Sequence, residues 1–353
     1  MREMLYYDVF DVREEEEYLE SETERSRREL KGLACRLESN DPDLTEISLD
    51  LEMERESFAR LVSVLSCSTH LRRLRCCHWG LGDSGALELA HIPNHYQYPS
   101  STLSTSSLQQ LALPSCGITN VGVEALLQRL IDKEAFPNLV RLDLSRNNLR
   151  RGGSLEGTFR QLLPRLSHVQ ELDLSATGLT PSLVHAILTG LEDNNSVRTL
   201  DISNNFDSLE VLLDSIMEHL PRMKNLERLV LARGASSSTC IDYTNFNVLE
   251  QLLLCVRPND RLQFLGPLSI LPLDRESDKA TYALYGTCLE YLEQIRFCLE
   301  RNQCHALVRG MISRQEPASL LPTAMAKMTP SAIYYLLRET ASYRIVPGIS
   351  NAT

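Results

Sequence analysis

One eleven-residue phrase recurs along the middle of the chain and constrains its fold more than any other feature. It reads LVRLDLSRNNL at 139–149 and VQELDLSATGL at 169–179. It returns as VRTLDISNNF at 197–206 and fades to LERLVLARG at 226–234, at intervals of 28 to 30 residues. A repeat of this length predicts a stack of similar units, each of which buries its apolar face against its neighbours.

The sequence of each unit predicts a strand, a turn and a helix. The leucines at the fourth and sixth positions of the phrase point to the same side of a strand. Asn147 and Asn205 occupy the ninth position, where a buried amide can donate to and accept from the backbone of neighbouring coils. Thr180 followed by Pro181 is a helix start, and apolar residues at helical spacing follow it.

About eight units can be anchored on the first apolar residue of each strand. These anchors are Leu44, Leu71, Leu108, Leu139, Val169, Val197, Leu226 and Leu262. Parallel strands pack closely and helices need more room, so a stack with all strands on one side is expected to curve, with a concave sheet and convex helices.

The units resemble leucine-rich repeats, and specifically the ribonuclease-inhibitor-like subfamily, most clearly in LDLSRNNLRRGG at 142–153. The resemblance covers roughly residues 44–268. It implies a curved α/β solenoid with helical N- and C-terminal caps. It also implies a binding role for the concave face rather than catalysis.

Four segments are expected. Residues 1–43 form an acidic segment with a helical cap, in which Leu30, Leu33, Ala34 and Leu37 lie at helical spacing. Residues 44–270 form the solenoid. Residues 271–344 form a helical C-terminal cap, with helices over 288–299 and 333–338. Residues 345–353 form a flexible tail.

Composition excludes several classes of protein. The net charge of −11 disfavours nucleic-acid binding, which depends on neutralising phosphates. No apolar run is long enough to predict a membrane span. The N-terminus has no signal-peptide pattern, so the cytoplasm or nucleus is the expected location and the ten cysteines are expected to be reduced.

Motifs for chemistry are missing from the sequence. There is no phosphate-binding G-x-x-x-x-G-K-[ST] and no G-x-S-x-G nucleophile turn. His91 and His95 are separated by Pro93, which prevents them from sharing a helix face. Cys298, Cys304 and His305 lack a recognised ligand spacing. The chain is therefore expected to be non-enzymatic, with no cofactor and no metal site.

The residues between the repeated leucines are the candidates for partner binding. Asp143, Asp173 and Asp201 would stack on neighbouring strands and attract a basic partner, although LDLS is also ordinary consensus in this family. Arginines surround Trp79, which is a composition typical of protein interfaces. Trp79 also occupies the position of the buried asparagine, so packing in the core or the turn is at least as good an interpretation. The full candidate set is Arg73, Arg75, Trp79, Arg141, Asp143, Arg146, Asp173, Asp201, Arg228 and Arg233.

These observations predict an intracellular interaction scaffold that binds a protein partner through its concave face and rim loops. The insertions at 93–107 and 234–244 are candidate rim loops, with simple tolerance of insertion as the alternative. Two other functions follow from the resemblance alone. One is regulation of a small GTPase, as in the Ran GTPase-activating proteins, and the other is inhibition of a ribonuclease.

Overall fold

A computed structural model describes residues 27–50, 55–77, 80–91, 107–131, 136–151, 153, 155–206, 210–231, 240–241, 246–266, 268–270 and 279–313. Contacts divide the chain into two compact units. The first comprises Met1–Thr158 and Arg165–Gly178, and the second comprises Phe159–Pro164 and Leu179–Thr353. Helix α5 (Glu156–Leu162) and the 3-10 turn η2 (Leu163–Arg165) span the division.

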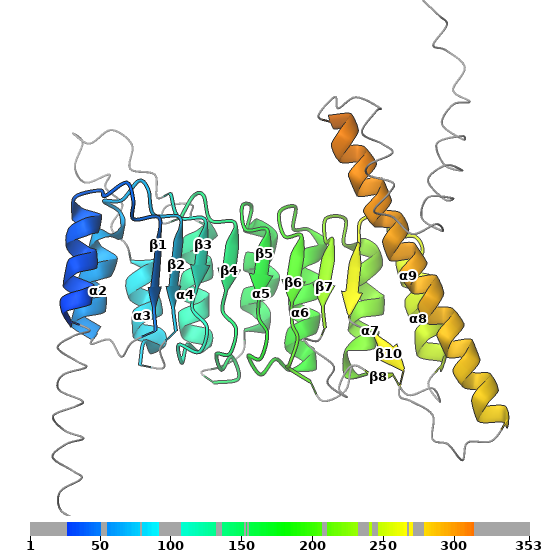
Figure 1. Cartoon of the computed structure of the whole chain (residues 1–353). Coiled ribbons are helices and arrows are strands. Elements are labelled where there is room, and N and C mark those ends of the chain that lie inside the picture. Colours follow the sequence, from blue (N-terminus) through cyan, green and yellow to red (C-terminus); the bar gives the residue numbers. More distant parts are fainter. Residues whose placement is uncertain are drawn as a thin grey trace, which may run out of the picture. The chain divides into compact units, whose positions relative to one another are not determined.

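The first unit alternates strands with helices, and its five strands pair in parallel in sequence order (Figure 1). A helix over 27–38 precedes them. The further elements are β1 (Glu46–Leu49), α2 (Arg55–Leu65), β2 (Arg73–Cys76), α3 (Gly82–Ala90), β3 (Gln110–Ala112), α4 (Asn120–Ile131), β4 (Arg141–Asp143) and β5 (Glu171–Asp173).

The second unit repeats this arrangement, and β6, β7 and β9 pair in parallel in the same order. Its elements are α6 (Pro181–Glu192), β6 (Thr199–Asp201), α7 (Glu210–His219), η3 (Leu220–Arg222), β7 (Arg228–Val230), β8 (Cys240–Ile241), α8 (Phe246–Val256), β9 (Phe264–Gly266), β10 (Ser269–Ile270) and α9 (Lys279–Ser313). The predicted fold class, an α/β leucine-rich repeat solenoid, is confirmed.

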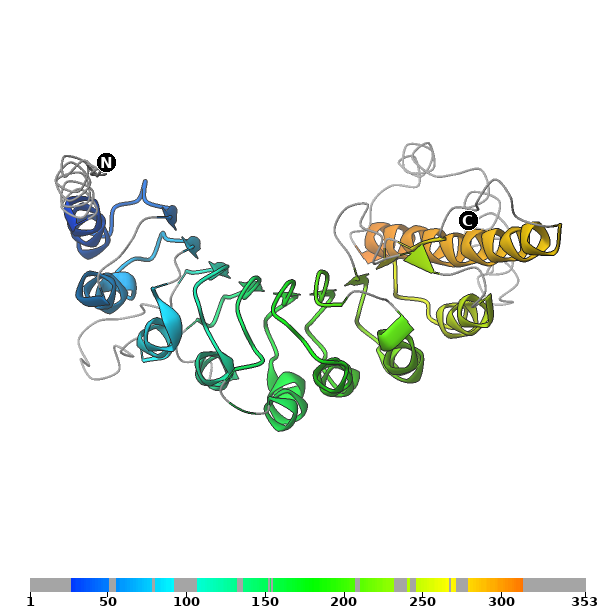
Figure 2. The ribbon, with the colours of Figure 1, turned by 90° about the horizontal axis from the view of Figure 1, so that it is seen from below.

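The predicted register of the strands is also confirmed within each unit. Ser48, Arg75, Ala112, Asp143 and Asp173 lie opposite one another across β1 to β5. In the second unit, Asp201, Val230 and Gly266 form the matching column. The alternate strand residues are buried apolar residues, mostly leucines, and the strands of each unit lie on the side opposite the helices of its repeats (Figure 2).

A buried asparagine holds the turn after β4 together. The Asn147 side-chain oxygen accepts from the backbone N–H groups of Cys116 and Ile118, both at 3.0 Å. Its amide nitrogen donates to the carbonyl oxygens of Leu113 and Leu144 at 2.8 Å. One side chain therefore satisfies backbone groups of two coils, which a turning chain would otherwise leave unpaired.

We expect Asn147→Ala to lower the free energy of unfolding by about 3 kcal/mol, because several buried backbone groups lose their partner. The neighbouring Asn148 is exposed and accepts one bond, from the Arg150 N–H. Asn148→Ala should therefore cost less than about 1 kcal/mol. Urea unfolding followed by circular dichroism measures both. Equal losses would contradict the structural role of Asn147.

Helices close both ends of the stack. In the helix over 27–38, Leu30, Ala34 and Leu37 are buried as predicted. At the other end, α9 packs on α8 and places Asn302 in the core, where its amide donates to the carbonyls of Asn259 and Leu262 at 2.8 and 2.7 Å. The helix thus supplies hydrogen-bond donors that a further coil would otherwise provide.

A second side chain of α9 makes a hydrogen bond that a further strand would otherwise make. Along the solenoid, the carbonyl that precedes each strand accepts an N–H from the next strand, as when Glu227 accepts from Gln263 at 2.7 Å. Strand β9 is the last described strand of its sheet, so no next strand offers a backbone N–H to the Gln263 carbonyl. The side-chain amide of Gln303 donates to this carbonyl instead, at 2.9 Å. The C-terminal cap therefore ends the sheet with side chains that substitute for backbone.

The cap differs from the predicted helix in two respects. The sequence indicated a helix over 288–299, whereas α9 runs from Lys279 to Ser313, because no proline interrupts it. Leu289, expected on the apolar face, is 43% exposed, and Cys288 is buried in its place. The predicted helix at 333–338, the tail at 345–353 and the insertion at 93–107 lie outside the described residues, apart from Ser107.

Part of the insertion at 234–244 forms secondary structure that the sequence did not predict. Strand β8 pairs in parallel with β10, with Cys240 opposite Ser269 and Ile241 opposite Ile270. This two-stranded sheet ties the insertion to the segment that follows β9. The segment was expected to be a rim loop, and the described part of it is instead a short strand.

Gly190 allows α6 to pack closely against the chain before it. A Cβ atom at this position would lie 2.6 Å from the backbone oxygen of Phe159. Gly190→Ala is therefore expected to destabilise the protein by about 2 kcal/mol, although alanine is the better helix former. Gly286 in α9 has open space around it, so Gly286→Ala should stabilise by about 0.5–1 kcal/mol. Thermal unfolding of the two variants should shift in opposite directions, and a shift in the same direction would refute the packing argument.

Candidate functional site

The exposed strand residues of the first unit form a row of charged and polar side chains. Glu46, Arg73, Gln110, Arg141 and Glu171 lie opposite one another on β1 to β5. The Arg73 guanidinium lies 3.1 Å from the Glu46 carboxylate, and that of Arg141 lies 3.6 Å from Glu171. All four side chains remain 43–53% exposed, so these pairs stabilise the fold little and can exchange for a partner's charges.

A hollow of about 310 Å³ lies where β1, β2 and β3 begin. It is lined by Thr45, Arg72, Arg73, Gln109 and Gln110. The sequence predicted Arg73 as a binding residue, and Arg72 and the two glutamines were not in the candidate set. The signal was present in their strand positions, since Arg73 and Gln110 occupy the same register. Two guanidinium groups with amide donors and acceptors suit a carboxylate-bearing ligand.

The three aspartates of the predicted acidic strip have local hydrogen-bond partners. Asp173 and Asp201 are each 6% exposed. Asp173 accepts from the N–H and hydroxyl of Ser175 at 3.0 and 2.7 Å, and Asp201 accepts likewise from Ser203 at 3.0 and 2.6 Å. An aspartate that bonds to the backbone two residues later stabilises a turn. Asp143 makes the same backbone bond to Ser145, but it is more exposed.

Replacement of Asp173 is therefore expected to change stability. Asp173→Ala leaves the buried N–H and hydroxyl of Ser175 without this acceptor and should cost about 2 kcal/mol. Asp143→Ala removes one half-buried bond and should cost about 1 kcal/mol. Chemical denaturation compares the two, and equal stability of wild type and Asp173→Ala would show that the carboxylate is not needed for the turn.

The remaining predicted residues occupy different settings. Arg75 on β2 is 55% exposed and lies 4.0 Å from Asp50. Arg146 is exposed in the turn after β4, with a left-handed backbone (φ 58°), and in the second unit Arg228 lies over the Phe264 ring, 4.6 Å from its centroid. Trp79 and Arg233 lie outside the described residues.

A second buried polar position, which the sequence did not predict, lies three residues before the first apolar residue of certain repeats. Ser68, Asn194 and Asn259 occupy it, and each accepts an N–H from the first apolar residue of its repeat, two residues before the strand begins. Asn194 also donates to the Leu163 carbonyl at 2.6 Å. Other units have Phe136, Leu166 and Met223 at this position, which hid the pattern.

Several of the described cysteines have thiols of low nucleophilic character. Burial raises the pKa of the Cys76 thiol far above its ordinary value, and burial also raises the pKa of Cys298 and Cys255. A thiol with a raised pKa is mostly protonated and a poor nucleophile. Cys76, Cys255 and Cys298 carry free thiols.

Comparison with known proteins supports a leucine-rich repeat protein. The family model described as "Leucine Rich repeat" matches residues 106–127. The chain is 38% identical over 84 residues to leucine-rich repeat-containing protein 45 of Gallus gallus, which covers 23% of this chain and 12% of that protein. It is 28% identical over 212 residues to NACHT, LRR and PYD domains-containing protein 14 of Mus musculus, covering 58% of this chain and 20% of that protein.

Among solved structures, the leucine-rich repeat-containing protein LegL7 from Legionella pneumophila is similar at 12% identity, over 75% of this chain and 94% of that one. Its TM-score is 0.30, which is too low to carry a functional argument. The chain covers at most a fifth of the length of the two curated relatives above, and the ribonuclease-inhibitor-like subfamily stays a prediction. Among the described residues, no helix is long and apolar enough to cross a membrane.

Proposed function

We propose that this chain is a non-enzymatic interaction scaffold of the cytoplasm or nucleus that binds a protein partner through its strand face and the adjoining loops. The observation that carries the proposal is the exposed charged row on β1 to β5. Its side chains alternate with one isoleucine and four leucines that are at most 2% exposed, so the surface is held on a rigid support. A preformed surface binds without a large ordering cost.

The hollow at the start of β1 to β3 suits an acidic segment of the partner. Arg72 and Arg73 are both exposed there, and Gln109 and Gln110 add hydrogen-bonding groups. The Glu46 carboxylate that pairs with Arg73 is itself about half exposed and can be displaced by a carboxylate of the partner. Arginine forks bind carboxylates with two parallel hydrogen bonds, which provides both affinity and orientation.

The expectation of a basic partner rested on Asp143, Asp173 and Asp201. Because Asp173 and Asp201 are buried and bonded to serines, their carboxylates contribute little exposed charge. Asp143 and the exposed Glu171 are the acidic groups left for a basic partner in this part of the sheet. The arginine-lined hollow is therefore the more favourable contact surface.

The test compares charge reversal on the two sides of the first unit. Arg72→Glu with Arg73→Glu places two carboxylates in the hollow and should weaken binding of an acidic partner at least tenfold. Arg60→Glu on α2 is the matched control, because Arg60 is exposed on a helix. Proximity labelling identifies the partner, and titration by interferometry measures its affinity for each variant.

The two variants should have the same melting temperature, since the substituted side chains are exposed. Equal affinity of the double variant and Arg60→Glu for the partner would rule out the hollow as the binding surface. Weaker binding of both by the same factor would indicate a general charge effect, which also contradicts the proposal.

A further inference from the structure

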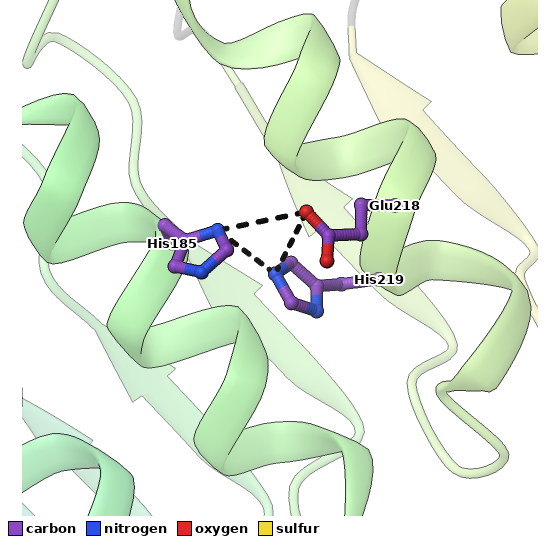
Figure 3. A group of neighbouring side chains, drawn as sticks. All are labelled: His185, Glu218 and His219. Carbon is purple, nitrogen blue, oxygen red and sulfur yellow. Dashed lines mark hydrogen bonds and ion pairs between the residues drawn. The ribbon is translucent and has the colours of Figure 1, made fainter.

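On the helix side of the second unit, two histidines and a glutamate converge from different repeats (Figure 3). His185 lies in the middle of α6, while Glu218 and His219 end α7. The sequence predicted no metal site. The solenoid brings the residues together because α6 and α7 are adjacent helices of the stack.

The three ligand atoms have the separations that a single small ion requires. His185 Nδ1 lies 3.1 Å from His219 Nε2 and 3.9 Å from Glu218 Oε2, and His219 Nε2 lies 4.0 Å from the same oxygen. One ion can lie about 2 Å from all three atoms, which is the usual distance from zinc to histidine nitrogen and carboxylate oxygen. The rings meet edge to face at an interplanar angle of 64°, and Figure 3 shows one nitrogen of each ring directed at the other and at the Glu218 oxygen.

A second carboxylate orients the buried histidine. His219 is 2% exposed, and its Nδ1 lies 2.6 Å from Glu192 Oε1. Nδ1 therefore carries the proton, and Nε2 presents its lone pair to the cluster. Arg222 donates to the same Glu192 oxygen at 3.1 Å. Burial alone would raise the pKa of Glu192, but the hydrogen bonds from His219 and Arg222 outweigh it and hold that pKa below its ordinary value.

We propose that His185, Glu218 and His219 form a site for zinc or a chemically similar transition-metal ion, with Glu192 as the positioning residue for His219. Two imidazole nitrogens and one carboxylate favour zinc, cobalt or nickel, whereas magnesium and calcium prefer oxygen ligands. Binding requires the His185 tautomer with its proton on Nε2. A neutral ring that carries its proton on Nδ1 changes tautomer, and only a doubly protonated ring releases a proton.

The site keeps one side open to solvent. The His185 and Glu218 side chains are 36% and 52% exposed, so a fourth ligand can approach from outside. That ligand is water or a side chain of a second molecule. A bound ion would also join α6 to α7 and stabilise the second unit, since a ligand that binds only the folded state adds to its stability.

The test measures binding of zinc to the full chain by equilibrium dialysis with elemental analysis. His185→Gln and Glu218→Gln change exposed side chains, so both variants are expected to fold. Each should bind zinc at the cluster at least tenfold more weakly than wild type. His91→Gln, an exposed histidine that ends α3 in the first unit, is the matched control and should bind as wild type does. Glu192→Gln should weaken binding about 10- to 100-fold without removing a ligand.

Cobalt separates this site from binding by the ten cysteines. Cobalt at the cluster should give visible bands without a sulfur-to-cobalt charge-transfer band, and His185→Gln should abolish them. Zinc should raise the melting temperature of wild type and of His91→Gln, but not of His185→Gln. The proposal is overturned if His185→Gln binds zinc as tightly as wild type, if cobalt shows thiolate ligation only, or if calcium competes equally with zinc.

Discussion

The hydrogen bonds of buried amide side chains at the turns between coils are the interaction on which this solenoid depends. Stacked leucines supply most of the apolar burial, but apolar contacts are not directional and fix no turn. Asn147 satisfies donors and acceptors of two consecutive coils at once, and Asn205 accepts from the Leu179 N–H in the same manner. Each coil therefore folds against a neighbour that completes its hydrogen bonding, which makes the ends of the stack its weakest point.

At both ends, amide side chains make the hydrogen bonds that a further coil would otherwise make. Asn40 accepts from the Thr69 N–H at 2.8 Å beside the first coil, and Asn302 and Gln303 donate to the carbonyls of the last one. Helix α9 packs on α8, and its Gln303 side chain bonds to the carbonyl that precedes β9. In the caps, as in the interior, amide side chains therefore satisfy the backbone hydrogen-bonding groups of a neighbouring coil.

The repeated phrase was sufficient to predict the fold class and the strand register, because its leucines occupy one side of every strand. It was not sufficient to separate a binding residue from a structural one. Asp143, Asp173 and Asp201 stand at the same position of the repeated phrase. At Asp173 and Asp201 a serine hydroxyl donates to the carboxylate, and both aspartates are buried. The segments that β8 and β10 join carry no repeated pattern, so the periodicity of the sequence does not predict this pairing.

The histidine cluster shows why side-chain chemistry on the helices is harder to predict than the fold. His185 and His219 are 34 residues apart, and Glu192 and His219 are 27 apart. Neither spacing is a metal-ligand motif within one helix. A solenoid places residues near one repeat apart beside each other, and the exact offset depends on where each helix begins after its turn. Ligand sites in such a fold are therefore to be sought between neighbouring helices of the stack, at separations of about one repeat.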